Sequence, residues 1–193
     1  MKKIIIPLLF LILSGFVNAQ PIFNLGLKAG VNSSKISFNI EDYTSESIVK
    51  AHFGAFARLG VGRIYVQPEA YFSAKGGELD QNVLNTVTAF NYKTLDVPVL
   101  LGFKLLKGKT VDLHVVAGPV FSYLTSSSID ENEDFSKEYF ADNYMGFQYG
   151  VGIDVLFLTL DARMEHGNNK LYSYAGINGK NQTFMLTVGL KIF

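Results

Sequence analysis

The stretch Tyr144 to Glu165, YMGFQYGVGIDVLFLTLDARME, decides the fold because its side chains alternate with a period of two. Up to a turn near Val155 and Leu156, apolar side chains occupy every second position, and glycines and polar side chains occupy the others. The same alternation resumes after the turn. A period of two is typical of β-strands. The stretch therefore predicts two antiparallel strands with one apolar face and one face that carries the charges.

Six other segments alternate in the same way, which brings the expected number of strands to eight. They cover residues 22–32, 51–60, 63–73, 90–104, 112–122 and 183–192. The connections are alternately long and short, with long polar loops expected at Ser33–Lys50, Lys75–Ala89, Thr125–Asn143 and Gly167–Asn181. This order predicts an all-β fold, an eight-stranded antiparallel up-and-down transmembrane β-barrel with short periplasmic turns and long extracellular loops.

The two faces differ most in charge. A charge that faces lipid near mid-depth costs a few kcal/mol, so the uncharged face is expected outside and the charged face inside. Inward glycines leave room for long side chains in the narrow interior of eight strands. The charged positions expected inside are the bases Lys28, Arg58, Arg63, Lys104, Arg163 and Lys191, and the acids Glu69, Asp96, Asp112, Asp154, Asp161 and Glu165.

A soluble barrel gives a competing interpretation of the same alternation. In a calycin-like periplasmic lipid-binding protein, the apolar face would point inward and the charges outward. The glycines of the polar face, the alternating loop lengths and the final Phe193 all favour the membrane barrel over this alternative.

Composition excludes several classes of function. The 193-residue chain has 17 basic and 17 acidic residues and no cysteine. A zero net charge without a basic stripe does not favour a nucleic-acid partner. The absence of cysteine excludes disulfides and thiolate chemistry.

The N-terminal segment has the pattern of a secretory signal peptide. Two lysines precede an apolar run from Ile4 to Leu13, which is too short to span a bilayer. Val17-Asn18-Ala19 supplies small residues before a cleavage site. Residues 1–19 are therefore expected to be the signal peptide, cut between Ala19 and Gln20, and residues 20–193 the outer-membrane barrel domain.

Three prolines, Pro68, Pro98 and Pro119, lie inside predicted strands. Each removes a hydrogen-bond donor from the ladder, and proline inside a sheet is typical of edges or bulges. A closed barrel has no edge. Local bulges are therefore expected at the three prolines.

These stretches also carry a family resemblance that runs in order over almost the whole mature chain. The chain resembles the PorT-type outer-membrane β-barrel family through Gln67-Pro68-Glu69, Gly76-Gly77, Leu95-Asp96-Val97-Pro98-Val99-Leu100-Leu101-Gly102, Ala117-Gly118-Pro119, Gly150-Val151-Gly152-Ile153-Asp154 and Leu160-Asp161-Ala162-Arg163. The resemblance implies an eight-stranded barrel in the outer membrane of a Gram-negative bacterium, surrounded by outer-membrane lipid. It implies no assigned activity, and one member is associated with a secretion machinery.

The resemblance also suggests partners. Phe193 is similar to the terminal aromatic residue that the barrel assembly machinery recognises. The alternating apolar residues of that signal are shifted by one, because Thr187, Gly189 and Lys191 occupy their places, so the facing of Phe193 stays open. An extracellular or secretion-machinery protein partner is expected to bind the long loops.

The sequence predicts no catalytic, cofactor-binding or metal-binding residues, and hence no enzyme. His52, His114 and His166 lie on different strands without metal-ligand spacing, which favours structural roles. A lipid-modifying enzyme with His166 as base and Ser173 nearby is the weaker alternative. The Asp130 to Asp134 loop has alternating acidic spacing, but Phe135 replaces the glycine of a calcium loop.

Overall fold

The computed structural model describes residues 21–38, 43–81, 86–129, 143–168, 172–174 and 177–193, and all its regular elements are β-strands. Within these residues, no helix is long and apolar enough to cross a membrane. The strands are β1 (Pro21–Phe38), β2 (Tyr43–Val61), β3 (Ile64–Gln81), β4 (Thr86–Lys107), β5 (Val111–Ile129), β6 (Asn143–Val155), β7 (Leu158–Gly167), β8 (Tyr172–Tyr174) and β9 (Ile177–Lys191).

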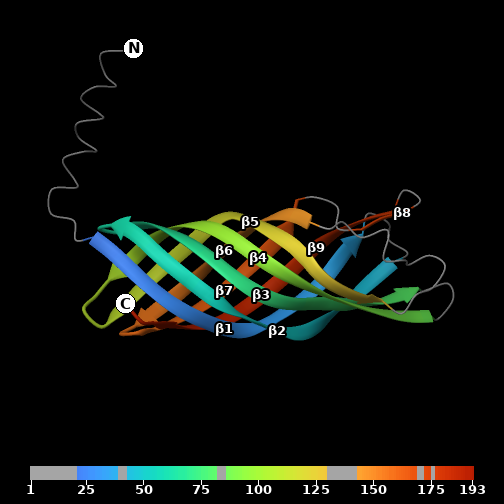
Figure 1. Cartoon of the computed structure of the whole chain (residues 1–193), viewed down its shortest axis with the longest axis horizontal. Coiled ribbons are helices and arrows are strands. Elements are labelled where there is room, and N and C mark those ends of the chain that lie inside the picture. The colour runs from blue at the N-terminus through green and yellow to red at the C-terminus, as the bar shows by residue number, and fades with distance from the viewer. Residues whose placement is uncertain (1–20, 39–42, 82–85, 130–142, 169–171, 175–176) are drawn as a thin grey trace, which may run out of the picture.

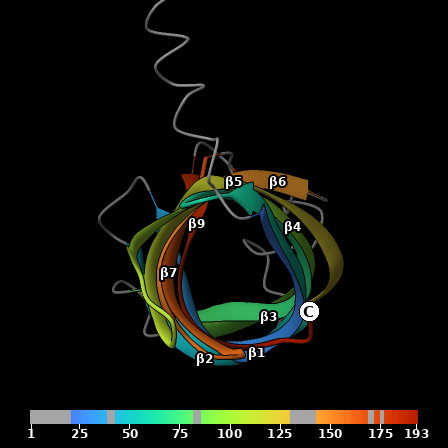
Figure 2. The ribbon, with the colours of Figure 1, turned by 90° about the vertical axis from the view of Figure 1, so that its left-hand side faces the viewer.

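Each long strand pairs antiparallel with its neighbours, and the sheet closes into a barrel (Figures 1 and 2). Pairing between β1 and β9 closes the ring, from Gly26↔Lys191 to Phe38↔Gly179. β8 pairs with the outer end of β9 and adds a short hairpin outside the ring. The predicted eight-stranded up-and-down barrel is therefore confirmed, with β8 formed inside the stretch expected to be the fourth long loop.

Three short turns lie together at one end of the barrel, on the left in Figure 1. Gly62 in the β2–β3 turn has a φ of 68°, which glycine adopts without strain. Leu156 in the β6–β7 turn has a φ of 54°, which is uncommon for a residue with a side chain. The β4–β5 turn is held by a hydrogen bond from the Gly108 amide to the Val111 carbonyl. The predicted tight rim is confirmed.

The strands at the opposite end extend further than the alternation predicts. β3 and β4 stay paired as far as Gln81↔Thr86, and β2 pairs with β3 from Tyr43↔Gln81. Much of the predicted loops at 33–50 and 75–89 is therefore strand, and this part of the prediction is wrong. Outside the lipid, polar residues can occupy both faces of a strand, so backbone pairing continues where the two-residue period is lost.

The bulges expected at the prolines are also absent from the described pairing. The β3–β4 register is the same before and after Pro68↔Val99, and Pro119 pairs with Phe147 in a register that is unbroken along β5 and β6. A proline removes one ladder donor without inserting a residue, so the register need not shift. Register shifts occur elsewhere, between Ser47 and His52, Lys93 and Thr94, and Lys104 and Leu106.

Burial confirms the predicted orientation of the two faces. On the outward face, Val151 and Leu160 are 53% and 49% exposed, whereas inward Arg58 and Tyr71 are fully buried. An apolar belt of this kind faces hydrocarbon in membrane barrels. The soluble barrel with an apolar interior is therefore wrong for this chain.

Candidate functional site

The interior of the barrel holds most of the charged side chains that the structure describes, and it is the candidate functional site. Of the positions expected inside, Asp112 and Lys191 lie near the tight-turn rim and are partly exposed. Nine others are buried: Lys28, Arg58, Glu69, Asp96, Lys104, Asp154, Asp161, Arg163 and Glu165.

Arg63 is the exception, and its predicted inward position is wrong. It lies in the β2–β3 turn, where it is exposed and its Nη1 donates to the Leu105 carbonyl at 2.9 Å. The turn falls one residue later than the alternation suggests, so Arg63 belongs to the turn and not to β3. A residue at a turn is free of the alternation that fixes the facing of strand residues.

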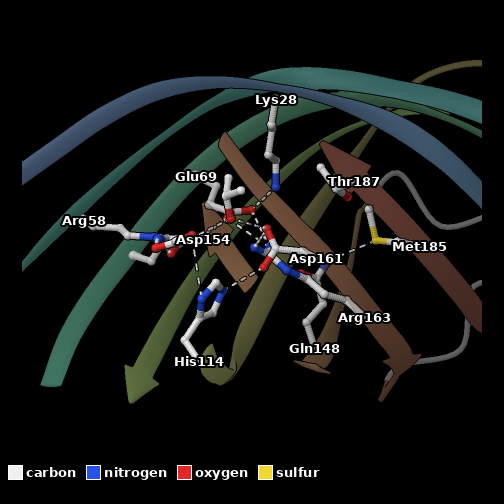
Figure 3. Close-up of polar contacts among 12 residues, drawn as sticks. Lys28, Arg58, Glu69, His114, Gln148, Asp154, Asp161, Arg163, Met185 and Thr187 are labelled. Atoms are coloured by element: carbon white, nitrogen blue, oxygen red, sulfur yellow. Dashed lines mark hydrogen bonds and ion pairs between the residues drawn. The ribbon is translucent and has the colours of Figure 1, made fainter. Parts of the chain in front are cut away.

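Glu69 of β3 lies at the centre of the interior (Figure 3). Arg163 Nη1 of β7 donates to both carboxylate oxygens at 2.9 Å, and Lys28 Nζ of β1 donates to Oε2. Gln67 Nε2 donates to Oε1 at 2.5 Å. Strands on different sides of the barrel are thus joined through one carboxylate, which can stay ionised because two cations and an amide bond it.

A second set of contacts runs from Arg163 toward the tight-turn rim (Figure 3). Arg163 Nη2 lies 3.2 Å from Asp161 Oδ2, and His114 Nε2 lies 2.9 Å from Asp161 Oδ1. His114 Nδ1 lies 3.7 Å from Asp154 Oδ1, and Arg58 Nη1 donates to Asp154 Oδ2 at 2.5 Å. His114 therefore lies between two carboxylates that each have an arginine neighbour, and it is within hydrogen-bond distance of Asp161. These side chains form one buried polar network between the centre of the lumen and the tight-turn rim.

Lys75 centres a third set of contacts near the long-loop end. Its Nζ lies 3.0 Å from Asp96 Oδ2 and donates to Glu165 Oε1 at 2.8 Å and to the Tyr144 hydroxyl at 2.7 Å. Lys75 was not predicted to face the lumen, because a loop was expected to begin at this residue. Its position two residues after Ser73 continues the inward parity of β3, and that signal could have identified it.

Inward glycines leave space for these side chains, as predicted. A methyl group at Gly102 would lie 2.1 Å from the Tyr65 ring. At Gly152 it would lie 2.3 Å from His114 Nε2 and 2.4 Å from Asp161 Oδ1. Real side-chain contacts are never this short. Any larger residue at these two positions therefore requires the interior packing to change.

The other two histidines, His52 and His166, lie in separate surroundings. His52 Nε2 lies 2.9 Å from Thr187 Oγ1, and outward-facing His166 stacks on Tyr149 with ring centroids 5.8 Å apart. No group of three His, Asp or Glu side chains in the described part of the chain could hold a metal ion. The side chain of Ser173 and the 130–134 segment lie outside the described residues.

The comparison with protein families decides the identification. Residues 18–180 match the family model described as outer membrane protein beta-barrel domain. The chain belongs to this family. It is an outer-membrane β-barrel protein of a Gram-negative bacterium, and this membership agrees with the apolar belt and the charged interior described above.

Two solved structures are similar to this barrel domain protein. Neisserial surface protein A (NspA) has a TM-score of 0.50 and 11% identity, and the match covers 87% of this chain and 97% of that chain. Ail, the attachment invasion locus protein of Yersinia pestis, crystallised with the heparin analogue sucrose octasulfate, has a TM-score of 0.45 and 14% identity over 88% of this chain and 99% of that chain. At such identities, the NspA match bears on the fold alone. A search of curated proteins gave no significant match.

Proposed function

We propose that the protein is a non-transporting, non-catalytic interaction protein of the outer membrane that contacts a protein partner at its long-loop end. The observation that carries this proposal is the set of ion pairs across the lumen, where Glu69 of β3 joins Lys28 of β1 and Arg163 of β7. The interior of an eight-stranded barrel is only wide enough for side chains. Buried, mutually bonded charges leave little room for a solute to pass.

Reconstituted protein is therefore expected to give negligible liposome swelling with sugars or amino acids. A large porin in the same liposomes serves as the positive control. A variant with Glu69, Arg163 and Lys28 all replaced by alanine tests whether the side chains plug the lumen, because it should swell liposomes faster than the wild type. Swelling by the wild type at porin-like rates would contradict the proposal.

The outer end of β1 and β2 supports a contact with another protein. The two strands pair with each other as far as Ser34↔Ile48, and then β1 continues along β9 while β2 continues along β3. In the described backbone, residues 35–38 and 43–47 thus have edges that are not paired with each other. Unpaired strand edges can accept a strand from another chain.

A photo-crosslinking residue at Ser37, introduced in living cells, is expected to capture a protein exposed at the cell surface or belonging to a secretion machinery. The same residue at Lys109, in the exposed β4–β5 turn, is the matched control and should not capture that protein. Identical products from both positions would contradict a partner at the long-loop end.

Three finer points belong to the same proposal. We propose that the chain is a PorT-type member of its family, because the motifs around Pro68, Pro98 and Pro119 resemble that group. We propose cleavage before Gln20, which Edman sequencing of the mature protein would test. Recognition by the barrel assembly machinery through Phe193 is also proposed; its side chain is 76% exposed, and its carbonyl accepts a hydrogen bond from the Leu25 amide at 3.1 Å.

A further inference from the structure

The outward wall formed by β5, β6, β7, β9 and β1 contains an apolar hollow. A space of about 740 Å³ surrounds the small side chain of Ala162, between the larger side chains of Val151, Leu186 and Val188. These three larger side chains are 53%, 48% and 51% exposed, which places the hollow on the lipid-facing surface and not in the lumen. Its apolar lining suits a hydrocarbon chain.

Two lysines lie above this hollow, toward the long-loop end. Val31 of β1 lines the hollow and pairs with Leu186, and Lys35 pairs with Gln182 further out. At about 3.3 Å per residue, Lys35 lies roughly 13 Å beyond Val31 along the strand. Lys180, two residues from Gln182 on β9, is diagonal to Lys35, and such diagonal positions are about 7–8 Å apart. Both lysine side chains are exposed.

No carboxylate among the described side chains forms an ion pair with Lys35 or Lys180. The six carboxylates that the structure describes are buried in the lumen or lie at its tight-turn rim, and none of them pairs with Lys35 or Lys180. Among the side chains that the structure describes, those on the outward face at this end thus carry positive charge alone. An anionic ligand would offset the positive charge of the two lysines.

A polar layer lies between Lys180 and the hollow, on the same rung as Lys35. His166 of β7 pairs in register with Gln182, and its ring stacks on Tyr149 of β6 at an interplanar angle of 11°. Amphipathic aromatic groups at this level are typical of the boundary between hydrocarbon and headgroups. The wall therefore presents an apolar region and, beyond it toward the long-loop end, polar and basic groups, which is the order of a lipid's acyl chain and phosphorylated headgroup.

We propose that this wall holds one phosphorylated lipid of the outer leaflet, with an acyl chain in the hollow beside Ala162 and a phosphate between Lys35 and Lys180. A second copy of the chain fits the wall less well. Two copies in one membrane have the same orientation, so a two-fold axis runs along the membrane normal and brings the lysine pairs together at one level. With no described carboxylate between them, like charges would repel.

Native mass spectrometry of the refolded mature protein tests this proposal, with diphosphorylated lipid A and its dephosphorylated counterpart as the two probes. The wild type should retain one diphosphorylated lipid and bind the dephosphorylated one on the order of tenfold more weakly. The variant K35Q/K180Q should bind the diphosphorylated lipid about tenfold more weakly than the wild type does, because each lysine near the headgroups contributes to anionic lipid binding. The variant A162F, which fills the hollow, should also lose affinity for both lipids.

The matched control is K107Q/K109Q, which removes two exposed lysines at the opposite end and should bind like the wild type. Three results would each overturn the proposal. K35Q/K180Q could bind the diphosphorylated lipid as tightly as the wild type, the control K107Q/K109Q could lose as much affinity as K35Q/K180Q, or the wild type could form a dimer without bound lipid. The heat-dependent shift in SDS gels verifies that every variant is folded. If A162F does not fold, A162V takes its place with the same expectation.

Discussion

Replacing Val151 with arginine is expected to block assembly of the barrel. Val151 lies on the outward face of β6, between Met145 and Val155, and is 53% exposed. In the membrane that exposed surface faces hydrocarbon, where an arginine near the midplane costs roughly 2–4 kcal/mol. Folded barrels resist SDS until boiled, so the variant should lose the band that shifts on heating.

Phe157→Arg is the matched control for this experiment. Phe157 is also apolar and 56% exposed, but it lies in the β6–β7 turn at the tight rim. Near the interface an arginine costs only about 0–1 kcal/mol, so this variant should assemble. Normal assembly of Val151→Arg would show that the outward face had been assigned to the wrong environment.

Glu69→Gln is expected to destabilise the barrel by about 3–5 kcal/mol, which is the usual cost of removing one partner from a buried ion pair. Glu69 bonds both Lys28 and Arg163, and the side chains of all three are at most 2% exposed. The neutral amide would leave two cations in the lumen without their shared counterion. Urea unfolding of the protein in lipid vesicles would measure the change in free energy.

The rim pair of Lys104 and Asp112 provides the control for Glu69. Its atoms are as close, at 2.5 Å, but its side chains are 10% and 14% exposed, so water can solvate the remaining charge. Asp112→Asn should therefore cost less than Glu69→Gln. An equal cost at the two sites would mean that water in the lumen screens the central network.

The sequence predicts the membrane-embedded part of the fold well because there each strand has one face in lipid. A strand such as β6 must alternate, since a slip by one residue would turn its whole apolar face inward. Beyond the lipid this constraint ends, and the outer parts of β1 to β4 could not be recognised. Lys75 was not predicted to face the lumen for the same reason, because it lies where the alternation weakens.

The sequence predicts which charged side chains face the lumen, but not which of them form ion pairs. Alternation places Glu69, Asp161 and Arg163 in the lumen, but the choice of partner depends on the register between strands and on the barrel's curvature, which a single sequence does not contain. The contact between Glu69 and Arg163 joins residues 94 positions apart. At Arg63 even the predicted facing fails, because a one-residue shift of a turn changes the facing of the residue beside it.

The closure of the ring by β1 and β9 has a consequence for the order of folding. The Asn24 side chain donates to the Phe193 carbonyl across a separation of 169 residues, so the first and last strands of the ring meet there. Loop closure over such a length is entropically the most costly step, and contacts of high sequence separation form slowly. The hairpins at the tight turns are therefore expected to form first. A chain truncated before β9 would remain an open sheet with two unprotected edges, prone to pair with other unfinished chains.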